Sequence, residues 1–150
     1  LLNIAELQKR TDDVTSKYHE LSDKIKLAEA RLKEIAELKT QIINFAKTRE
    51  VYTAYRKSGY SKDFLAEHET EILLHKAAKK SFDELNIQRL PTIKSLNDEF
   101  TELVTEKKKL YHEYTSVRDE MRKLLIHKSN VEKILGTGDS TTEKKTEHER

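Results

Sequence analysis

The sequence lacks cysteine and tryptophan, and it has only three glycines and one proline, Pro91. Without cysteine the chain has no disulfide, no thiolate zinc site and no cysteine nucleophile. A β-rich fold needs many more turn residues than four. No run of about 18 apolar residues is present, so no segment is suited to spanning a membrane. These absences exclude disulfide-rich and β-rich classes, and we expect a cytoplasmic protein without a membrane partner.

Charged and helix-favouring residues dominate the chain instead. Ala, Glu, Lys, Leu and Arg make up half of its 150 residues, which is typical of long helices and coiled coils. The hydrophobic share is 35%, below the roughly 45–50% of an ordinary globular domain, so we expect a narrow seam between helices. The net charge of +2 lacks the basic excess typical of nucleic-acid-binding domains. The chain begins with Leu rather than Met, and we expect it to be part of a longer protein.

The first predicted element is a long helix over about residues 3–57. Apolar and aromatic residues recur there at heptad spacing, the pattern of a coiled-coil helix. The heptad a positions are Ile4, Thr11, Tyr18, Ile25, Leu32, Lys39 and Ala46, and the d positions are Leu7, Val14, Leu21, Ala28, Ile35, Ile42 and Arg49.

A short helical tip is predicted over about residues 58–91. Gly59 can end the long helix in the left-handed conformation, and Ser61 can cap a short helix that has Asp63 in its first turn. Tyr60 and Leu65 have the spacing of a hydrophobic staple. A second helix is expected over about residues 71–85, with a break near residues 68–70; one continuous helix is the alternative. Its predicted buried side consists of Ile72, Leu73, Ala77, Phe82 and Leu85.

A second long helix is predicted over about residues 92–135, after Pro91 and before Gly136. Either Thr92 or Ser95 can cap it. Its a positions are Ile93, Phe100, Lys107, Tyr114, Met121, Lys128 and Leu135, and its d positions are Leu96, Leu103, Leu110, Val117, Leu124 and Val131. A polar tail of residues 137–150, which contains no apolar residue, follows a single helical domain of residues 1–136.

The predicted fold class is therefore all-α: an antiparallel coiled-coil hairpin of two long helices with a short helical tip. We expect Ile42 to lie near Leu103, and Ile25 near Met121 or Leu124. This register brings Lys39 close to Lys107, so Leu38 and Val104 are expected to replace them in the seam. A dimer formed through the long helices is the competing arrangement.

No pattern of catalytic or metal-binding residues is present. The six histidines form no HExxH or other ligand spacing, and solvent-facing histidine is the default interpretation. The sequence has no nucleophile elbow, Walker loop or dinucleotide fingerprint. We therefore predict no catalytic, metal or cofactor site and no small-molecule substrate.

One end of the predicted hairpin combines basic residues with tyrosines. Basic side chains bind phosphates, and tyrosines can stack on unpaired bases, so DNA is one expected partner. The competing interpretation is that the tyrosines pack the tip and the lysines are solvated. The candidate residues are Arg49, Tyr52, Tyr55, Arg56, Lys57, Lys62, Lys76, Lys79 and Lys80. The run Lys107-Lys108-Lys109, with Glu102, Glu106 and Glu113 nearby, is interpreted as a solvated face.

Five segments between Thr48 and Gly136 carry a likeness to a known family. They are Thr-Arg-Glu-Val-Tyr-Thr-Ala-Tyr-Arg-Lys at 48–57, Ala-Glu-His-Glu-Thr-Glu-Ile at 66–72, Leu-Pro at 90–91, Glu-Lys-Lys-Lys-Leu-Tyr at 106–111 and Asn-Val-Glu-Lys-Ile-Leu-Gly at 130–136. In pattern and order this stretch resembles the carboxy-terminal helical region of relaxases, the mobilisation proteins of Gram-positive conjugative and mobilisable elements.

The resemblance implies an accessory role. Relaxases nick DNA through a tyrosine and a metal-binding histidine cluster in an amino-terminal nuclease domain, and no residue of this chain matches that cluster. It implies that this region is not catalytic and that its partners are DNA, the conjugative transfer machinery or a second copy of itself.

Overall fold

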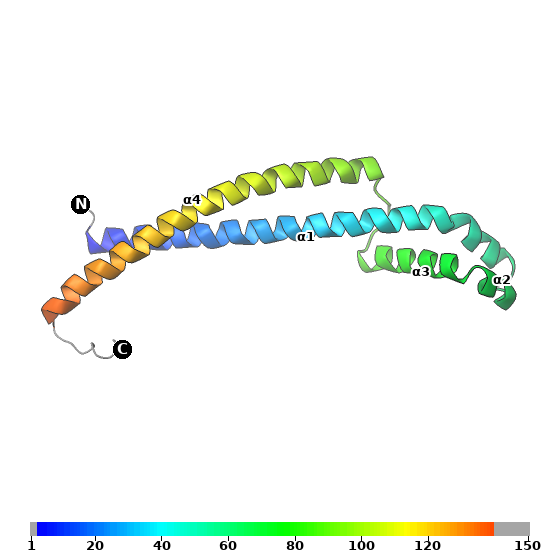
Figure 1. The fold of residues 1–150 in the computed structure, drawn as a ribbon, viewed down its shortest axis with the longest axis horizontal. Helices are drawn as coiled ribbons and strands as arrows, with labels where there is room; N and C mark the ends of the chain where they lie inside the picture. Colours follow the sequence, from blue (N-terminus) through cyan, green and yellow to red (C-terminus); the bar gives the residue numbers. More distant parts are fainter. Residues whose placement is uncertain (1–2, 140–150) are drawn as a thin grey trace. The chain divides into compact units, whose positions relative to one another are not determined.

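The computed structural model describes residues 3–139, which form four α-helices and no strand (Figure 1). These are α1 (Ile4–Lys57), α2 (Lys62–Glu67), α3 (Glu69–Glu84) and α4 (Ile93–Asp139). The long helices α1 and α4 pack against each other, so the predicted all-α helical hairpin is confirmed. No helix within residues 3–139 is long and apolar enough to cross a membrane.

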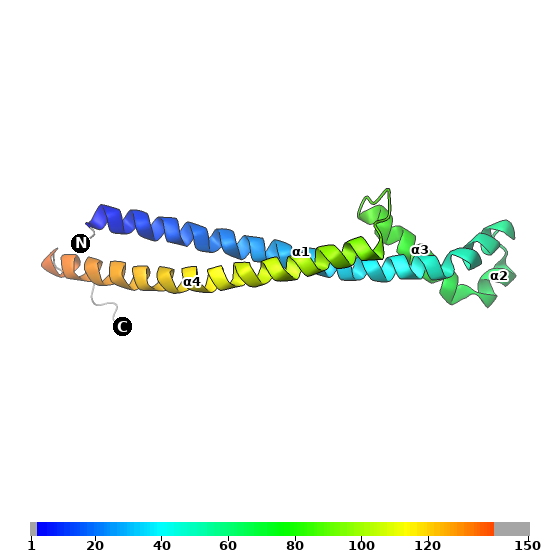
Figure 2. The same ribbon diagram turned by 90° about the horizontal axis from the view of Figure 1, so that it is seen from above.

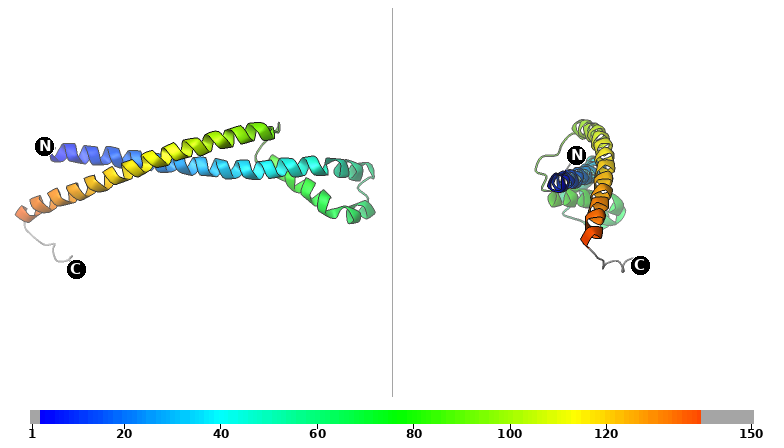
Figure 3. Two further views of the ribbon diagram at one scale, coloured as in Figure 1. Left: turned by 45° about the horizontal axis from the view of Figure 1, so that its top comes forward. Right: turned by 90° about the vertical axis from the view of Figure 1, so that its left-hand side faces the viewer.

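The chain divides into two compact units. Among the described residues, unit 1 contains residues 3–27 and 107–139, and unit 2 contains Ala28–Glu106. In unit 1 the first part of α1 and the later part of α4 run antiparallel, side by side (Figure 2). In unit 2, α2 and α3 turn back so that α3 lies along the later part of α1 (Figure 3).

Local capping explains why the helices begin and end where they do. At the start of α1, Asn3 and Glu6 bond each other's backbone N–H groups, at 2.8 and 3.0 Å. After α1, Gly59 has the predicted left-handed conformation, with φ +76°. The Ser61 hydroxyl accepts from the Phe64 N–H at the start of α2, as predicted.

The boundaries of α2, α3 and α4 decide between the alternatives that the sequence left open. The chain breaks at His68, which ends α2 and precedes α3, so the single continuous helix is wrong. Thr92 rather than Ser95 caps α4, because its Oγ1 accepts from the Ser95 N–H at 3.0 Å. The predicted stop at Gly136 is also wrong, since α4 continues to Asp139. An interior glycine costs a helix only about 1 kcal/mol. Of the predicted polar tail, residues 140–150 lie outside the described residues.

The buried side of α3 differs from the prediction. It consists of Ile72, His75, Ala78 and Phe82. The predicted members Leu73, Ala77 and Leu85 are exposed. The observed spacing follows one stripe of a helix, whereas Leu73 and Ala77 lie on the neighbouring stripe. Because both stripes carry apolar residues, the sequence alone does not show which stripe of α3 faces α1.

In unit 1 the heptad seam is formed in part as predicted, since the predicted members Ile4 and Leu135 are exposed. The a and d side chains Leu7, Thr11, Leu21 and Ile25 of α1 are buried, and so is Val117 of α4. Thr11 is tolerated at this depth because its hydroxyl donates to the Leu7 carbonyl at 2.8 Å. The heptad assignment therefore identifies these residues of the interface in this unit.

Unit 2 has the thicker core because α1 contacts two helices there. The core cluster consists of Ile35, Leu38, Ala78, Phe82 and Leu96, with Ile42, Phe45, Ile87 and Leu103 packed against it. Leu38 is buried, as predicted, and Val104 is half-buried. Lys39, which heptad spacing places in the seam, lies with its Nζ 5.8 Å from the centre of the Phe100 ring.

Ion pairs show that the predicted register is wrong by about two heptads. In unit 1, Lys17 bonds Glu113 at 3.0 Å and Arg10 bonds Glu120 at 3.1 Å. Met121 therefore lies at the level of residue 10 of α1 and not beside Ile25. An apolar heptad repeat looks the same after every seven residues, so hydrophobic spacing alone cannot choose between such registers.

Shortening Leu96 tests the core of unit 2. Leu96 is 1% exposed and Leu27 is 71% exposed. We expect Leu96→Ala to lower the free energy of unfolding by about 2–5 kcal/mol, because it removes buried methyl groups and leaves a cavity. The matched variant Leu27→Ala is expected to change it by less than about 0.5 kcal/mol. Equal effects in urea unfolding followed by circular dichroism contradict this core assignment.

Candidate functional site

The predicted basic tip lies in unit 2 and is built around His75, which sequence reasoning placed in solvent. His75 is 6% exposed. Its ring stacks between Phe45 and Tyr52, at centroid distances of 4.5 and 4.3 Å and interplanar angles of 22° and 13°. His75 Nδ1 lies 3.0 Å from the Thr48 hydroxyl, which itself donates to the Asn44 carbonyl at 2.7 Å. We therefore assign the ring proton to Nδ1, donating to Thr48 Oγ1.

Burial lowers the pKa of His75, and the nearby charge of Lys79 lowers it further. The stacked ring of His75 joins α3 to α1.

The two candidate tyrosines of α1 take part in this packing. Tyr55 is 6% exposed, and its ring contacts Tyr60 edge-on at 5.3 Å and stacks with Phe64 at 6.2 Å. Tyr52 stacks on His75, as described, and lies 5.9 Å from the ring of Tyr55. The rings fix α1 against α2 and α3, which supports the packing interpretation over base stacking by these two residues.

The structure gathers only some of the candidate basic residues. Lys76 Nζ lies 5.8 Å from the centre of the Tyr55 ring. Arg49 and Lys57 line one shallow hollow on α1, together with Glu50, Thr53 and Ala54. Within residues 3–139, no hydrogen bond, ion pair or ring contact joins Arg56, Lys62 or Lys80 to the aromatic cluster. These side chains are exposed and are positioned only by their helices.

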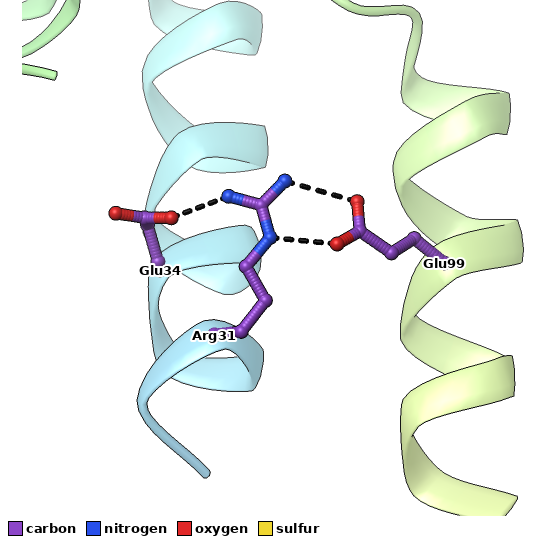
Figure 4. A network of polar contacts seen from close by, with 3 residues as sticks. All are labelled: Arg31, Glu34 and Glu99. Carbon is purple, nitrogen blue, oxygen red and sulfur yellow. Dashed lines mark hydrogen bonds and ion pairs between the residues drawn. The ribbon is translucent and has the colours of Figure 1, made fainter. Parts of the chain in front are cut away.

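A second polar arrangement in unit 2 joins α1 to α4 (Figure 4). Arg31 donates to both carboxylate oxygens of Glu99, from Nε at 2.7 Å and from Nη2 at 2.9 Å, and its Nη1 bonds Glu34. The hydrogen bond to Glu99 raises the pKa of Arg31, and the same bond lowers the pKa of Glu99. This planar, two-point geometry fixes the relative height of the two helices in the unit.

Unit 1 contains an aromatic stack that sequence reasoning treated only as seam. Tyr18 and Tyr114 stack at 5.0 Å, and their hydroxyl oxygens lie 3.0 Å apart. This hydrogen bond raises the pKa of Tyr114. Tyr111 continues the stack, with its ring centre 5.7 Å from that of Tyr114, and it is 54% exposed.

The described residues contain no metal-binding group of three or more His, Cys, Asp or Glu side chains. His68 bonds Glu71 at 3.2 Å. Within residues 3–139, the candidate residues form no arrangement of nucleophile, base and orienting group.

Two features of the structure were not predicted from the sequence, although the sequence contains a signal for each. His75 lies three residues from both Ile72 and Ala78, which places it on the buried stripe of α3. Tyr111 has basic residues at helical spacing on both sides, at Lys108 and Arg118. Comparisons with protein families, with curated proteins and with solved structures gave no match.

The buried His75 makes the stability of unit 2 depend on pH. Since the folded-state pKa is lowered, the unfolded chain takes up this proton first as the pH falls below about 6.5. The free energy of unfolding therefore falls through the window between 6.5 and the folded-state pKa. We expect His75→Phe, which keeps an aromatic ring in the stack, to remove this part of the pH dependence.

The measurement is urea unfolding at several pH values between 7.5 and 5. The exposed His112→Gln is the control and is expected to keep the wild-type profile. Parallel profiles for the wild type and His75→Phe contradict the assignment.

Proposed function

We propose that the chain is a non-catalytic helical accessory domain of a conjugative relaxase. In this role it supports assembly of the DNA-processing complex by protein or DNA contact, in the cytoplasm of the cell that carries the mobile element. The observation that carries the proposal is the resemblance of residues 48–136 to the carboxy-terminal helical region of relaxases.

Two of the five segments that carry the resemblance coincide with structural features of unit 2. The segment 48–57 supplies Thr48, Tyr52 and Tyr55, which pack around His75 or beside it. The segment 66–72 contains the break at His68 and the buried Ile72. Positions that form an irregular turn and its core are more specific than a heptad pattern, because heptads recur in unrelated coiled coils.

The same packing argues against a nuclease role for these tyrosines. A nucleophilic tyrosine must reach a phosphodiester, whereas Tyr55 is buried and Tyr52 is stacked against His75. In the proposed parent protein, nicking belongs to a separate nuclease domain, and this chain contributes binding surface.

A structural or oligomerisation coiled coil without a nucleic-acid role is the second candidate. The interhelical ion pairs and the involvement of both tip tyrosines in packing favour it. A spacer needs only a stiff, solvated hairpin, and it predicts no salt-dependent binding to DNA.

DNA binding at the tip separates the two candidates. We expect the 150-residue chain to bind labelled DNA at 50 mM salt and to lose affinity as salt rises. Arg56, Lys57 and Lys62 are replaced together by Gln. For each phosphate that this variant no longer neutralises, we expect the slope of log K against log salt concentration to become less steep by about 0.7–0.9. The control replaces Lys9 and Lys94 by Gln. Both lysines are exposed, and each forms an ion pair with the aspartate four residues later.

Absence of binding at 50 mM salt, together with no effect of the tip variant, excludes a DNA contact at the tip. The relaxase assignment is tested separately by the sequence of the reading frame that surrounds this chain. A nuclease domain with a histidine cluster encoded upstream supports the relaxase assignment, and a frame that encodes no such domain contradicts it.

A further inference from the structure

Acidic and basic side chains lie on opposite sides of α4 in unit 1. Glu113 and Glu120, one heptad apart, bond Lys17 and Arg10 of α1. These carboxylates are therefore neutralised by the neighbouring helix. Residues that lie on the other side of α4 keep their own charge.

That other side is basic and carries an exposed aromatic ring. Lys108, Tyr111, Arg118 and Arg122 are spaced by 3, 7 and 4 residues, which places them on one stripe of the helix. We call these four residues the α4 basic face. No Asp or Glu occupies the positions 3, 4, 7 or 11 residues from Tyr111. The face therefore has the charge that attracts phosphates.

The tyrosine on this face is held in place and accessible. Tyr111 stacks on Tyr114, which stacks on Tyr18 and shares a hydroxyl hydrogen bond with it. Tyr111 is nevertheless 54% exposed. An oriented ring with a free surface differs from Tyr52 and Tyr55 at the tip, whose rings are engaged in packing.

The adjoining arginine has an unsatisfied donor. Arg118 Cζ lies 6.0 Å from the centre of the Tyr114 ring, which positions the guanidinium. Its Nε is buried without a hydrogen-bond partner in the described part of the chain and forms a long ion pair with Asp119, at 3.8 Å. Lys108 and Arg122 are exposed, and within residues 3–139 neither forms an ion pair. Lys108 and Arg122 thus remain available to an anionic partner, and Arg118 has only the long ion pair with Asp119.

We propose that the α4 basic face binds single-stranded nucleic acid, with one base stacked on Tyr111 and phosphates bound by Lys108, Arg118 and Arg122. Single strands fit because an unpaired base exposes the flat surface that an aromatic ring needs, whereas pairing and stacking cover it in a duplex. From Lys108 to Arg122 the face extends about 21 Å along the helix, enough for several nucleotides. This inference rests on the DNA contact of the proposed function, and adds to the contact expected at the tip a second one on α4.

The test is fluorescence anisotropy of a labelled 20-nucleotide oligothymidine with the 150-residue chain at 50 mM salt. We expect Tyr111→Leu to weaken binding by about 5- to 100-fold, through loss of one stacked base. Tyr111→Phe is expected to restore most of the affinity. Arg118→Gln and Arg122→Gln are each expected to make the slope of log K against log salt concentration less steep by about 0.7.

Tyr60→Leu is the matched control, because Tyr60 is also 54% exposed but lies at the tip. It is expected to leave binding unchanged. A 20-base-pair duplex is expected to bind more weakly than the single strand. Oligouridine is included as well: equal binding assigns the site to single strands of either sugar, and preference for oligothymidine assigns it to DNA. Circular dichroism of each variant reports whether the helices are retained.

Two results overturn the inference and are distinguishable from failure of the proposed function. If Tyr111→Leu binds like the wild type while the Arg56, Lys57 and Lys62 variant loses binding, the DNA contact lies at the tip and the proposed function stands. If the chain binds no single strand at 50 mM salt, the α4 site is excluded, and the upstream reading frame still decides the relaxase assignment.

Discussion

The arrangement of this chain depends on ion pairs that join α1 to α4 at heptad spacing. Arg10 bonds Glu120 and Lys17 bonds Glu113 in unit 1, and Arg31 holds Glu99 with two hydrogen bonds in unit 2. Each exposed pair contributes at most about 1 kcal/mol to stability. Their larger effect is on specificity, since a shift by one heptad breaks the two hydrogen bonds between Arg31 and Glu99 while leaving the apolar seam filled.

The register of α1 against α4 determines which helix packs against each part of α1 in unit 2. Because Arg31 lies beside Glu99, the first turn of α4 lies near Leu38, where Leu96 joins the core cluster. The part of α1 after Leu38 has no α4 to pack against, and α3 occupies that surface instead. His75, Phe45 and Tyr52 meet there, and so the candidate tip residues became part of a packed core.

Sequence predicted the local features of the fold well because they depend on neighbouring residues. Gly59, Ser61 and Thr92 act through bonds to residues within one helical turn, and the heptad residues of unit 1 follow directly from spacing. The register and the inward stripe of α3 depend on which helices meet, and apolar residues on two stripes left that choice open. For the candidate site, the basic character of the tip could be read from sequence. The burial of Tyr55 and the free ring of Tyr111 could not, because both follow from tertiary contacts.

The register itself is the most direct test, and the absence of cysteine makes it simple to measure. A Tyr18→Cys and Tyr114→Cys pair replaces two rings whose hydroxyls lie 3.0 Å apart, and a short bismaleimide should join the two thiols within one chain in dilute solution. A pair at Ile25→Cys and Met121→Cys should remain unjoined, because about two heptads of helix separate the two levels. Efficient crosslinking of the second pair and not of the first would contradict this register of α1 against α4 in unit 1.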